Sequence, residues 1–414
     1  MQTQQHQDLG WIDNIGIEIK EQVVELAPEL IELSHTIYNN PELKFEEFQA
    51  ASALEKLLAK KGFDIKSGIC GMKTAFRAER SFGKGGPTIG IFCEYDALAD
   101  IGHACGHNII ATSGAGAAIA ALQWLEKQPV VNGRIIVLGS PGEEGGGGKV
   151  HLINGGELKD IDAMVMVHPF GYDVIEMPNL SRIALDVEFL GKSSHASSAP
   201  EQGLNALDAA TLMLVAIGLL RQQLRPDSRV HAVVVDGGQA VNIIPERSRV
   251  KILIRSPDDD YLQKRLYRAI CDCAQGSAIA TGTTVQISEA APLYQSIKSN
   301  LILSQIAVKA FGVIGRKMNW SPTSPSGDIK IANANAGSTD MGNVTRVLPA
   351  IHPYICLEEG LDLHTRQFQK AAGSQSGDKA AIDAASALGT IICSLIKDPE
   401  LVNKAKQEFD NNKN

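Results

Sequence analysis

Residues 88–93, TIGIFC, form an apolar run of the length and composition of one buried strand. The same kind of run returns as RIIVL at residues 134–138 and as AMVMV at residues 163–167. Between the first and second runs, residues 111–125 (ATSGAGAAIAALQWL) predict a helix. Between the second and third runs, residues 149–154 predict a shorter helix. Strands that alternate with helices in this order predict βαβ units, and hence an α/β fold with a mostly parallel sheet and helices on both faces.

The pattern changes near Ser181. Residues 183–189 alternate between apolar and polar side chains, and residues 203–224 form a long amphipathic helix. Two further strands, a second helix and a last strand follow, and this β-α-β-β-α-β succession is typical of a small antiparallel sheet backed by two helices. We therefore predict a main α/β domain at residues 1–180 and 293–414, interrupted by an inserted α+β domain at residues 181–292.

Composition narrows the class of protein. A chain of 414 residues exceeds one ordinary core and predicts two domains. The net charge of -8 is spread along the chain, which argues against nucleic acid or an anionic membrane as a partner. The longest apolar run, near residues 212–220, is too short to span a membrane. The 7 cysteines are scattered and odd in number, so we expect a reducing cytoplasm and no disulfide framework.

The stretch HACGHN at residues 103–108 is the first candidate site. It places a thiol between imidazoles at a bend, just after the strand-like run at residues 88–93. Residues two apart diverge on a helix but can converge from a loop, and both residue types bind borderline metals. Cys105 also lies close to the start of the next helix, where the pKa of a thiol is lowered. This stretch therefore predicts a metal site.

Further donors follow the other predicted strands. In an open parallel sheet, ligand-binding groups gather outside the carboxyl ends of the strands. One Cys, one Glu and three His are too many for a single tetrahedral zinc ion with an open position, but enough for two metals that share Cys105. Of two adjacent glutamates, one would bind metal and the other would act as general base, and the spacing leaves open which is which. The candidates are Cys105, His107, Glu143, Glu144, His168 and His364.

A series of motifs, taken in order, resembles the dinuclear metallo-amidohydrolases that include aminoacylases, hippurate hydrolases, auxin-conjugate hydrolases and glutamate carboxypeptidase. The series covers nearly the whole chain, which makes it far more specific than any one motif. The motifs lie at residues 40–43 (NPEL), 103–108 (HACGHN), 141–148 (PGEEGGGG), 167–169 (VHP), 191–196 (GKSSHA), 242–245 (NIIP), 337–340 (GSTD) and 363–364 (LH).

The resemblance implies roles for the residues of the main domain. Glu143 would be the general base. One metal would be bound by Cys105, Glu144 and His364, and the other by Cys105, His107 and His168. Zinc or manganese fits such donors first, and cobalt or nickel is also accepted by them.

The resemblance also implies that the inserted domain is a lid and dimerisation domain. His195 would reach across a homodimer to stabilise the oxyanion in the partner's active site. Asn242 and Arg255 would contact the amide or the carboxylate of the substrate. The chain has Asn108 where many members have Asp, and it also carries Arg366 and the sequence STDMGNV at residues 338–344. In these features it resembles the branch that contains aminobenzoyl-glutamate hydrolase and the β-alanyl-lysine type of dipeptidase.

The expected function is metal-dependent hydrolysis of the amide bond of a small N-acyl amino acid, dipeptide or aryl-amide glutamate conjugate. Two alternatives stay open at this point. One is an acylase with a strict preference for N-acyl amino acids, and the other is a non-catalytic protein that kept the fold and binds metal or amides. A structural metal site is usually closed and lacks a spare carboxylate beside its ligands, which favours the enzyme.

Overall fold

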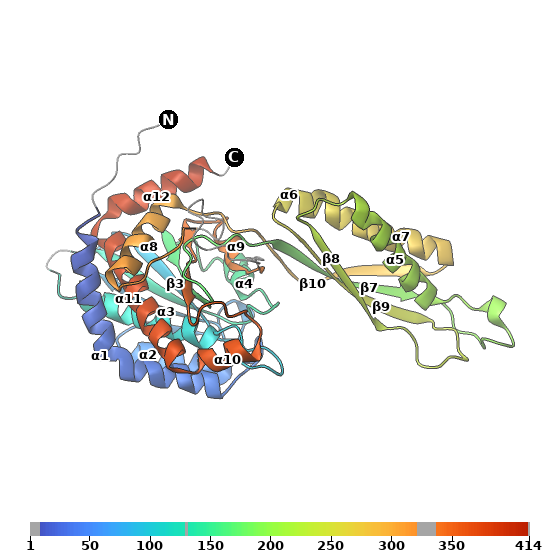
Figure 1. Cartoon of the computed structure of the whole chain (residues 1–414), viewed down its shortest axis with the longest axis horizontal. Helices are drawn as coiled ribbons and strands as arrows, with labels where there is room; N and C mark the ends of the chain where they lie inside the picture. Colours follow the sequence, from blue (N-terminus) through green and yellow to red (C-terminus); the bar gives the residue numbers. More distant parts are fainter. Residues whose placement is uncertain (1–8, 129–130, 321–336, 413–414) are drawn as a thin grey trace. The chain divides into compact units, whose positions relative to one another are not determined.

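The computed structural model describes residues 9–128, 131–320 and 337–412 (Figure 1). The chain forms two compact units. The large unit comprises Met1–Met177, Ile297–Asn335 and Asn343–Asn414, and the small unit comprises Pro178–Ser296 and Ala336–Gly342.

The large unit contains a six-stranded sheet in the order β1-β2-β4-β3-β5-β11. The four strands from β4 to β11 are parallel, and three of them, β3, β4 and β5, were predicted as parallel strands. Every residue of β3 is buried, which requires cover on both faces of the sheet. The antiparallel strands β1 and β2 were not predicted. The strands are β1 (Asp64–Ser67), β2 (Phe76–Phe82), β3 (Thr88–Glu94), β4 (Gly133–Ser140), β5 (Ala163–Val165) and β11 (Ala350–Ile351), and a separate parallel pair is β6 (His168–Phe170) with β12 (Tyr354–Cys356).

The core helices of the large unit pack closely because small residues line them. α3 contacts β3 and β4, α11 packs along α3, and α1 contacts both helices. A Cβ atom at Gly114 would lie 2.7 Å from Phe92 O, and one at Gly116 would lie 2.7 Å from Leu30 Cδ1, so glycine permits both contacts. The helices are α1 (Ile12–Asn39), α2 (Phe48–Lys60), α3 (His107–Leu125), α4 (Gly148–Asn154), α8 (Leu301–Val313), α10 (Arg366–Ala372), α11 (Gln375–Lys397) and α12 (Pro399–Asn411). The short helix α9 (Met341–Val344) begins in the small unit and ends in the large one.

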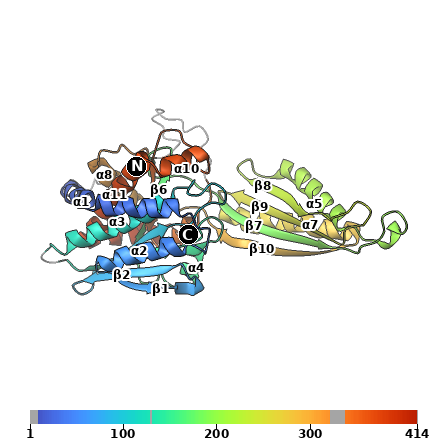
Figure 2. The same cartoon turned by 90° about the horizontal axis from the view of Figure 1, so that it is seen from below.

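Two of these helices, α3 and α11, are long and apolar enough to cross a membrane by length and composition. Their most apolar windows are 94% and 83% buried, which is the property of core helices. Figure 2 shows α2 beside the strands β1 and β2, which it contacts.

The small unit has an antiparallel four-stranded sheet in the order β10-β7-β9-β8. Residues of β7 alternate between buried and half-buried, because its apolar side chains pack under α5 and α7 in one core. The other face of the sheet carries the charged side chains. The elements are β7 (Ser181–Leu190), α5 (Ala206–Leu220), β8 (Arg229–Asp236), β9 (Arg247–Ser256), α6 (Asp259–Tyr261), a π-helical turn (Leu262–Leu266), α7 (Tyr267–Thr281) and β10 (Thr284–Tyr294).

Candidate metal centre

Four segments, made of loops and the first residues of the elements that follow them, bring the candidate donors together at one edge of the sheet of the large unit. Three of them follow the parallel strands β3, β4 and β5, whose carboxyl ends point the same way, and the fourth precedes α10. Donors that are far apart in the chain meet here for that reason. In chain order the segments carry Cys105 with His107 at the start of α3, Glu143 with Glu144, His168 at the start of β6, and His364.

The donors form two sets that share one thiol. Cys105, His107 and His168 each place a donor atom within 4.8 Å of the others, and Cys105, Glu144 and His364 do the same. Glu143 lies in a further set with His107 and Glu144. Two sets of three donors around one shared sulfur match the donor pattern of a two-metal site.

The two buried imidazoles are held in the tautomer that metal binding needs. His107 Nδ1 lies 2.8 Å from the backbone oxygen and 3.0 Å from Oδ1 of Asp96, and His168 Nδ1 lies 2.7 Å from Pro169 O. These acceptors place the proton on Nδ1 and the lone pair on Nε2. Within the described ranges, His107 Nε2 is buried without a hydrogen-bond partner, and His168 Nε2 lies 3.5 Å from Cys105 Sγ. The residues therefore fit a metal ion.

The charges at the centre also suit a cation. Burial lowers the pKa of His168 to about 4, which keeps this imidazole neutral as a ligand must be. Contacts with Cys105 and Glu144 raise the pKa of His364 to about 10. Burial raises the pKa of Glu144, but His364, whose Nε2 lies 3.1 Å from Oε1, together with His107 and Cys105 outweighs burial and lowers the value to about 2. The thiol and the carboxylate thus attract positive charge.

Two backbone positions at the centre have left-handed conformations. Gly106 has a φ of 76° as the N-cap of α3, and a Cβ atom there would lie 2.5 Å from Pro169 Cγ. His364 has a φ of 61°, which a residue with a Cβ atom rarely adopts, and its N–H donates to Ala104 O at 3.0 Å. Such strain is concentrated at functional sites.

The predicted residues of the small unit lie in adjoining loops and on β9. The side chain of His195 is exposed, and its Nδ1 accepts from Ser197 N at 3.3 Å, which places the ring proton on Nε2. The backbone oxygen of Asn242 accepts from Ala196 N at 3.0 Å, so the two loops lie side by side. Arg255 is half-buried on the charged face of β9.

Known proteins resemble this chain over nearly its whole length. The Xaa-Arg dipeptidase of Mus musculus is 36% identical over 94% of this chain and 90% of its own length. A family model described as a peptidase dimerisation domain matches residues 181–269. The chain belongs to the M20 peptidase family. The resemblance predicted from the motifs is thereby confirmed, together with the enzyme class, metal-dependent hydrolysis of amide bonds.

Other M20 relatives agree in length and fold. One of the proteins that make up the p-aminobenzoyl-glutamate hydrolase of Escherichia coli is 29% identical over 91% of this chain and 91% of its own length. The crystal structure of the Bacillus subtilis YXEP protein, described as a dinuclear metal binding peptidase of the M20 family, has a TM-score of 0.63. It covers 90% of this chain and 99% of its own at 18% identity, so it shows the shared fold.

Sequence reasoning missed several buried groups of this M20 site. Asp96, 1% exposed, holds His107 and accepts from Glu144 N at 2.9 Å through Oδ2. Glu94 forms an ion pair with Lys149, and both side chains are fully buried. Glu94 Oε2 lies 3.5 Å from His107 Nε2. A signal was available, because both carboxylates stand at the carboxyl end of the strand predicted at residues 88–93.

Two members of the HACGHN motif lie away from the donors. His103 Nε2 is 3.1 Å from Ile37 O, and burial lowers the pKa of this histidine to about 4. Asn108 Nδ2 donates to Ser34 Oγ at 2.9 Å and to Ala372 O at 3.0 Å. Asn108 thus joins α1 to the end of α10, and within this motif the donors are Cys105 and His107.

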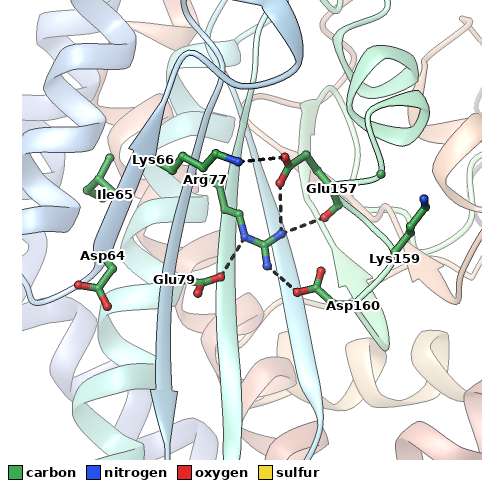
Figure 3. A pocket seen from close by; sticks show the side chains of 9 residues that line it. Asp64, Ile65, Lys66, Arg77, Glu79, Glu157, Lys159 and Asp160 are labelled. Carbon is green, nitrogen blue, oxygen red and sulfur yellow. Dashed lines mark hydrogen bonds and ion pairs between the residues drawn. The ribbon is translucent and has the colours of Figure 1, made fainter.

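A cleft of about 430 Å³ in the large unit is lined by β1, β2 and the segment after α4 (Figure 3). Arg77 lies at its centre, with Nε 2.9 Å from Glu79 Oε2 and Nη2 2.8 Å from Asp160 Oδ2. Arg77 Nη1 donates to Glu157 O at 3.0 Å. Arg77 and Lys66 pair with the carboxylates of Glu79, Glu157 and Asp160. The cleft brings none of the predicted donors together.

Proposed function

We propose that this M20 chain is a dinuclear metallohydrolase that cleaves the amide bond of a dipeptide, an N-acyl amino acid or an aryl-amide glutamate conjugate. The observation that carries the proposal is the meeting of two three-donor sets at Cys105, with Glu143 beside them. Because two of the relatives are dipeptidases, dipeptides are the first substrates to be tested. The aminobenzoyl-glutamate hydrolase relative supports the aryl-amide conjugate as the second candidate.

The metal ligands follow from the two donor sets. Cys105, His107 and His168 would hold one ion, and Cys105, Glu144 and His364 the other. Zinc or manganese is expected first, with cobalt or nickel also accepted by this mixture of sulfur, nitrogen and oxygen. When bound, such ions acidify water and polarise an amide carbonyl.

The proton transfers belong to Glu143. Its carboxylate is buried and its donor atom lies within 4.8 Å of those of His107 and Glu144, so it is close to both sets of proposed ligands without belonging to either. Glu143 would take a proton from the attacking water and pass it to the leaving amine. The positions of the two glutamates thus support Glu143 as the base and Glu144 as the ligand.

The inserted domain, residues 181–292, would supply substrate contacts, and residues 1–180 with 293–414 would form the catalytic domain. His195 would donate from Nε2 to the oxyanion, because its Nδ1 is the acceptor for Ser197 N. Asn242, in the loop beside it, would contact the amide.

Arg255 would bind the carboxylate of the substrate. It lies in register with Arg182 on β7 and with Arg229 on β8. Among the residues that the structure describes, none of these three guanidinium groups forms an ion pair. Like charges directly opposite on neighbouring strands are unfavourable unless an anion joins them, and a carboxylate fits an arginine fork.

A homodimer through the small unit is the expected assembly. Leu212, Val215 and Leu219 on α5 are 39%, 54% and 62% exposed, and their spacing puts them on one stripe of the helix. β8 is an edge strand of the sheet and can pair with another chain. Both features support the dimer that the name of the matched family model suggests.

We propose a reducing cytoplasm as the compartment, because the seven cysteines are scattered along the chain and odd in number.

A substrate panel tests the proposed function. The purified protein, loaded with zinc or manganese, is incubated with dipeptides that end in Arg or Lys, with N-acyl amino acids, and with aminobenzoyl-glutamate. We expect release of the amino acid from at least one class. Release from N-acyl amino acids alone favours the strict acylase, and no release by a fully metal-loaded protein would favour the non-catalytic binder.

The variant Glu143→Gln is the matched control for this panel. It should bind both metals as the wild type does, because Glu143 is outside the two sets of ligands. Its kcat should fall by about 10²- to 10⁴-fold, the usual contribution of a general acid–base group. Appreciable remaining activity would defeat the assignment of the base.

A further inference from the structure

Glu47 has a fully buried carboxylate. It is neither a proposed metal ligand nor a proposed substrate contact. Its Oε1 accepts from Phe45 N at 2.8 Å and from Gly142 N at 2.9 Å, and its Oε2 accepts from Thr74 Oγ1 at 2.8 Å. A buried carboxylate without hydrogen bonds would lower the stability of the fold, and these three hydrogen bonds remove that cost. The group is therefore firmly placed.

The contact with Gly142 matters because Gly142 directly precedes Glu143. On the other side of Glu143, the backbone N–H of Glu144 donates to Asp96 Oδ2 at 2.9 Å. The two peptide groups that flank Glu143 are thus each held by a carboxylate from a distant segment. We call this arrangement, formed by Glu47 and Asp96 on the N–H groups of residues 142 and 144, the loop clamp.

Phe45 adds a second contact between the segment that carries Glu47 and the loop that carries Glu143. Its backbone has a φ of 64°, a strained conformation that the bond from its N–H to Glu47 stabilises. A Cβ atom at Gly146 would lie 2.5 Å from Phe45 Cε2, and one at Gly142 would lie 3.0 Å from the same ring. The loop of Glu143 is therefore glycine-rich where it meets Phe45, and the ring packs directly on its backbone.

We propose that Glu47 is a positioning residue for the general base, and that it acts by fixing the backbone on the amino side of Glu143 through Gly142. The proposal rests on the function proposed for Glu143. Asp96 holds the carboxyl side of the same loop, but it also holds His107. Glu47 contacts neither a metal donor nor Glu143 itself in its three hydrogen bonds, so its effect on proton transfer is separable from metal binding.

Loss of the contact between Glu47 and Gly142 should affect the chemical step more than substrate binding. A general base must lie within hydrogen-bond reach of the water that it deprotonates, and a displacement of about 1 Å can reduce the rate by about 10²-fold. Loss of the clamp on one side would let Glu143 move while the ligands of both metals keep their own supports. Hence kcat should fall more than KM changes.

Three variants separate positioning from packing. Glu47→Ala removes the bond to Gly142. Glu47→Gln keeps an acceptor oxygen for the N–H groups of Phe45 and Gly142, and its amide can donate to Thr74 Oγ1. Thr74→Val is the matched control, because it removes the bond to Oε2 while leaving the contact of Glu47 with Gly142 in place.

The experiment measures kcat, KM and bound metal for the metal-loaded enzyme, and hydrogen exchange of the peptide that contains Gly142. We expect Glu47→Ala to lower kcat by about 10- to 100-fold with KM changed less than about threefold, with metal content retained and exchange at residue 142 accelerated. Glu47→Gln should recover most of kcat and of the protection. Thr74→Val should keep both within about threefold of the wild type.

Two results would overturn the proposal. One is an unchanged kcat in Glu47→Ala despite faster exchange, and the other is an equal loss of kcat in Glu47→Ala and Thr74→Val. A wild type that hydrolyses nothing would instead refute the proposed function, while the exchange data would still report whether Glu47 holds the loop.

Discussion

At the scale of single residues, the centre depends on which atom of each imidazole bears the proton. His107 and His168 both place Nδ1 against an acceptor, and both turn Nε2 toward the sulfur of Cys105. Asp96 has a double task, because one oxygen fixes His107 and the other accepts from the backbone of Glu144. One carboxylate thus orients a donor from each proposed metal site.

The variant Asp96→Asn should therefore weaken metal binding. The amide would present N–H where Glu144 N needs an acceptor, and it would lose the charge that supports His107. We expect the affinity for zinc to fall by about 10- to 100-fold in competition with a chromophoric chelator.

Asp100→Asn is the control for this variant. It makes the same change on the same loop at an exposed position with a φ of 66°, which Asn also tolerates. Its zinc affinity should match that of the wild type. Equal affinities in all three proteins would contradict the role assigned to Asp96.

At the scale of elements, the junction between β3 and α3 sets the positions of Cys105 and His107. Gly106 lies between them in a left-handed conformation, and Pro169, next to His168, occupies the space where its side chain would be. The helix can therefore begin at His107 while Cys105 turns back toward β6. A residue with a Cβ atom would strain the backbone and displace the neighbouring donor.

The variant Gly106→Ala should lower the free energy of unfolding of the large unit by about 1–3 kcal/mol, measured by urea denaturation. Gly312→Ala, near the end of α8 in the same unit, is the matched control, because nothing lies within 4 Å of its added Cβ atom. This control should leave stability unchanged or raise it by up to about 1 kcal/mol. Equal stability of the two variants would argue against strain at Gly106.

At the scale of the whole molecule, the proposed chemistry is divided between two units. The metal donors and Glu143 belong to the large unit, whereas His195, Asn242 and Arg255 belong to the small unit. The exposed apolar stripe of α5 favours pairing of small units from two chains. If His195 serves the partner's site, two inactive chains can complement each other.

Co-expression of Glu143→Gln and His195→Ala with different affinity tags should yield a hybrid dimer with one working site. We expect about half of the wild-type kcat per dimer, because the intact Glu143 of one chain meets the intact His195 of the other. The control is a hybrid of Glu143→Gln with the double variant Glu143→Gln/His195→Ala, which should stay inactive. A first hybrid that is no more active than its parent variants would mean that His195 does not act across the dimer.

The sequence predicted a strand wherever one short segment had a clear apolar pattern. The apolar runs that became β3, β4 and β5 were long or strongly β-branched, so the parallel sheet could be predicted from them. Cys105, Glu144 and His168 come after the carboxyl ends of those strands, and their nearness follows from the parallel arrangement. The edge strands gave a weaker signal: β1 has the polar sequence DIKS, and β11 has two residues. The polar helix α12 was missed for the same reason.

Residue types at strand ends were enough to predict a metal-binding edge on a parallel sheet, because the period of side chains and the direction of strands are local properties. Only the tertiary structure decided which groups hold that edge in place. Glu47 and Gly142 are 95 residues apart, and Asp96 and Glu144 are 48 apart. Their hydrogen bonds depend on how the loops pack in three dimensions, and no periodicity along the chain encodes such a contact.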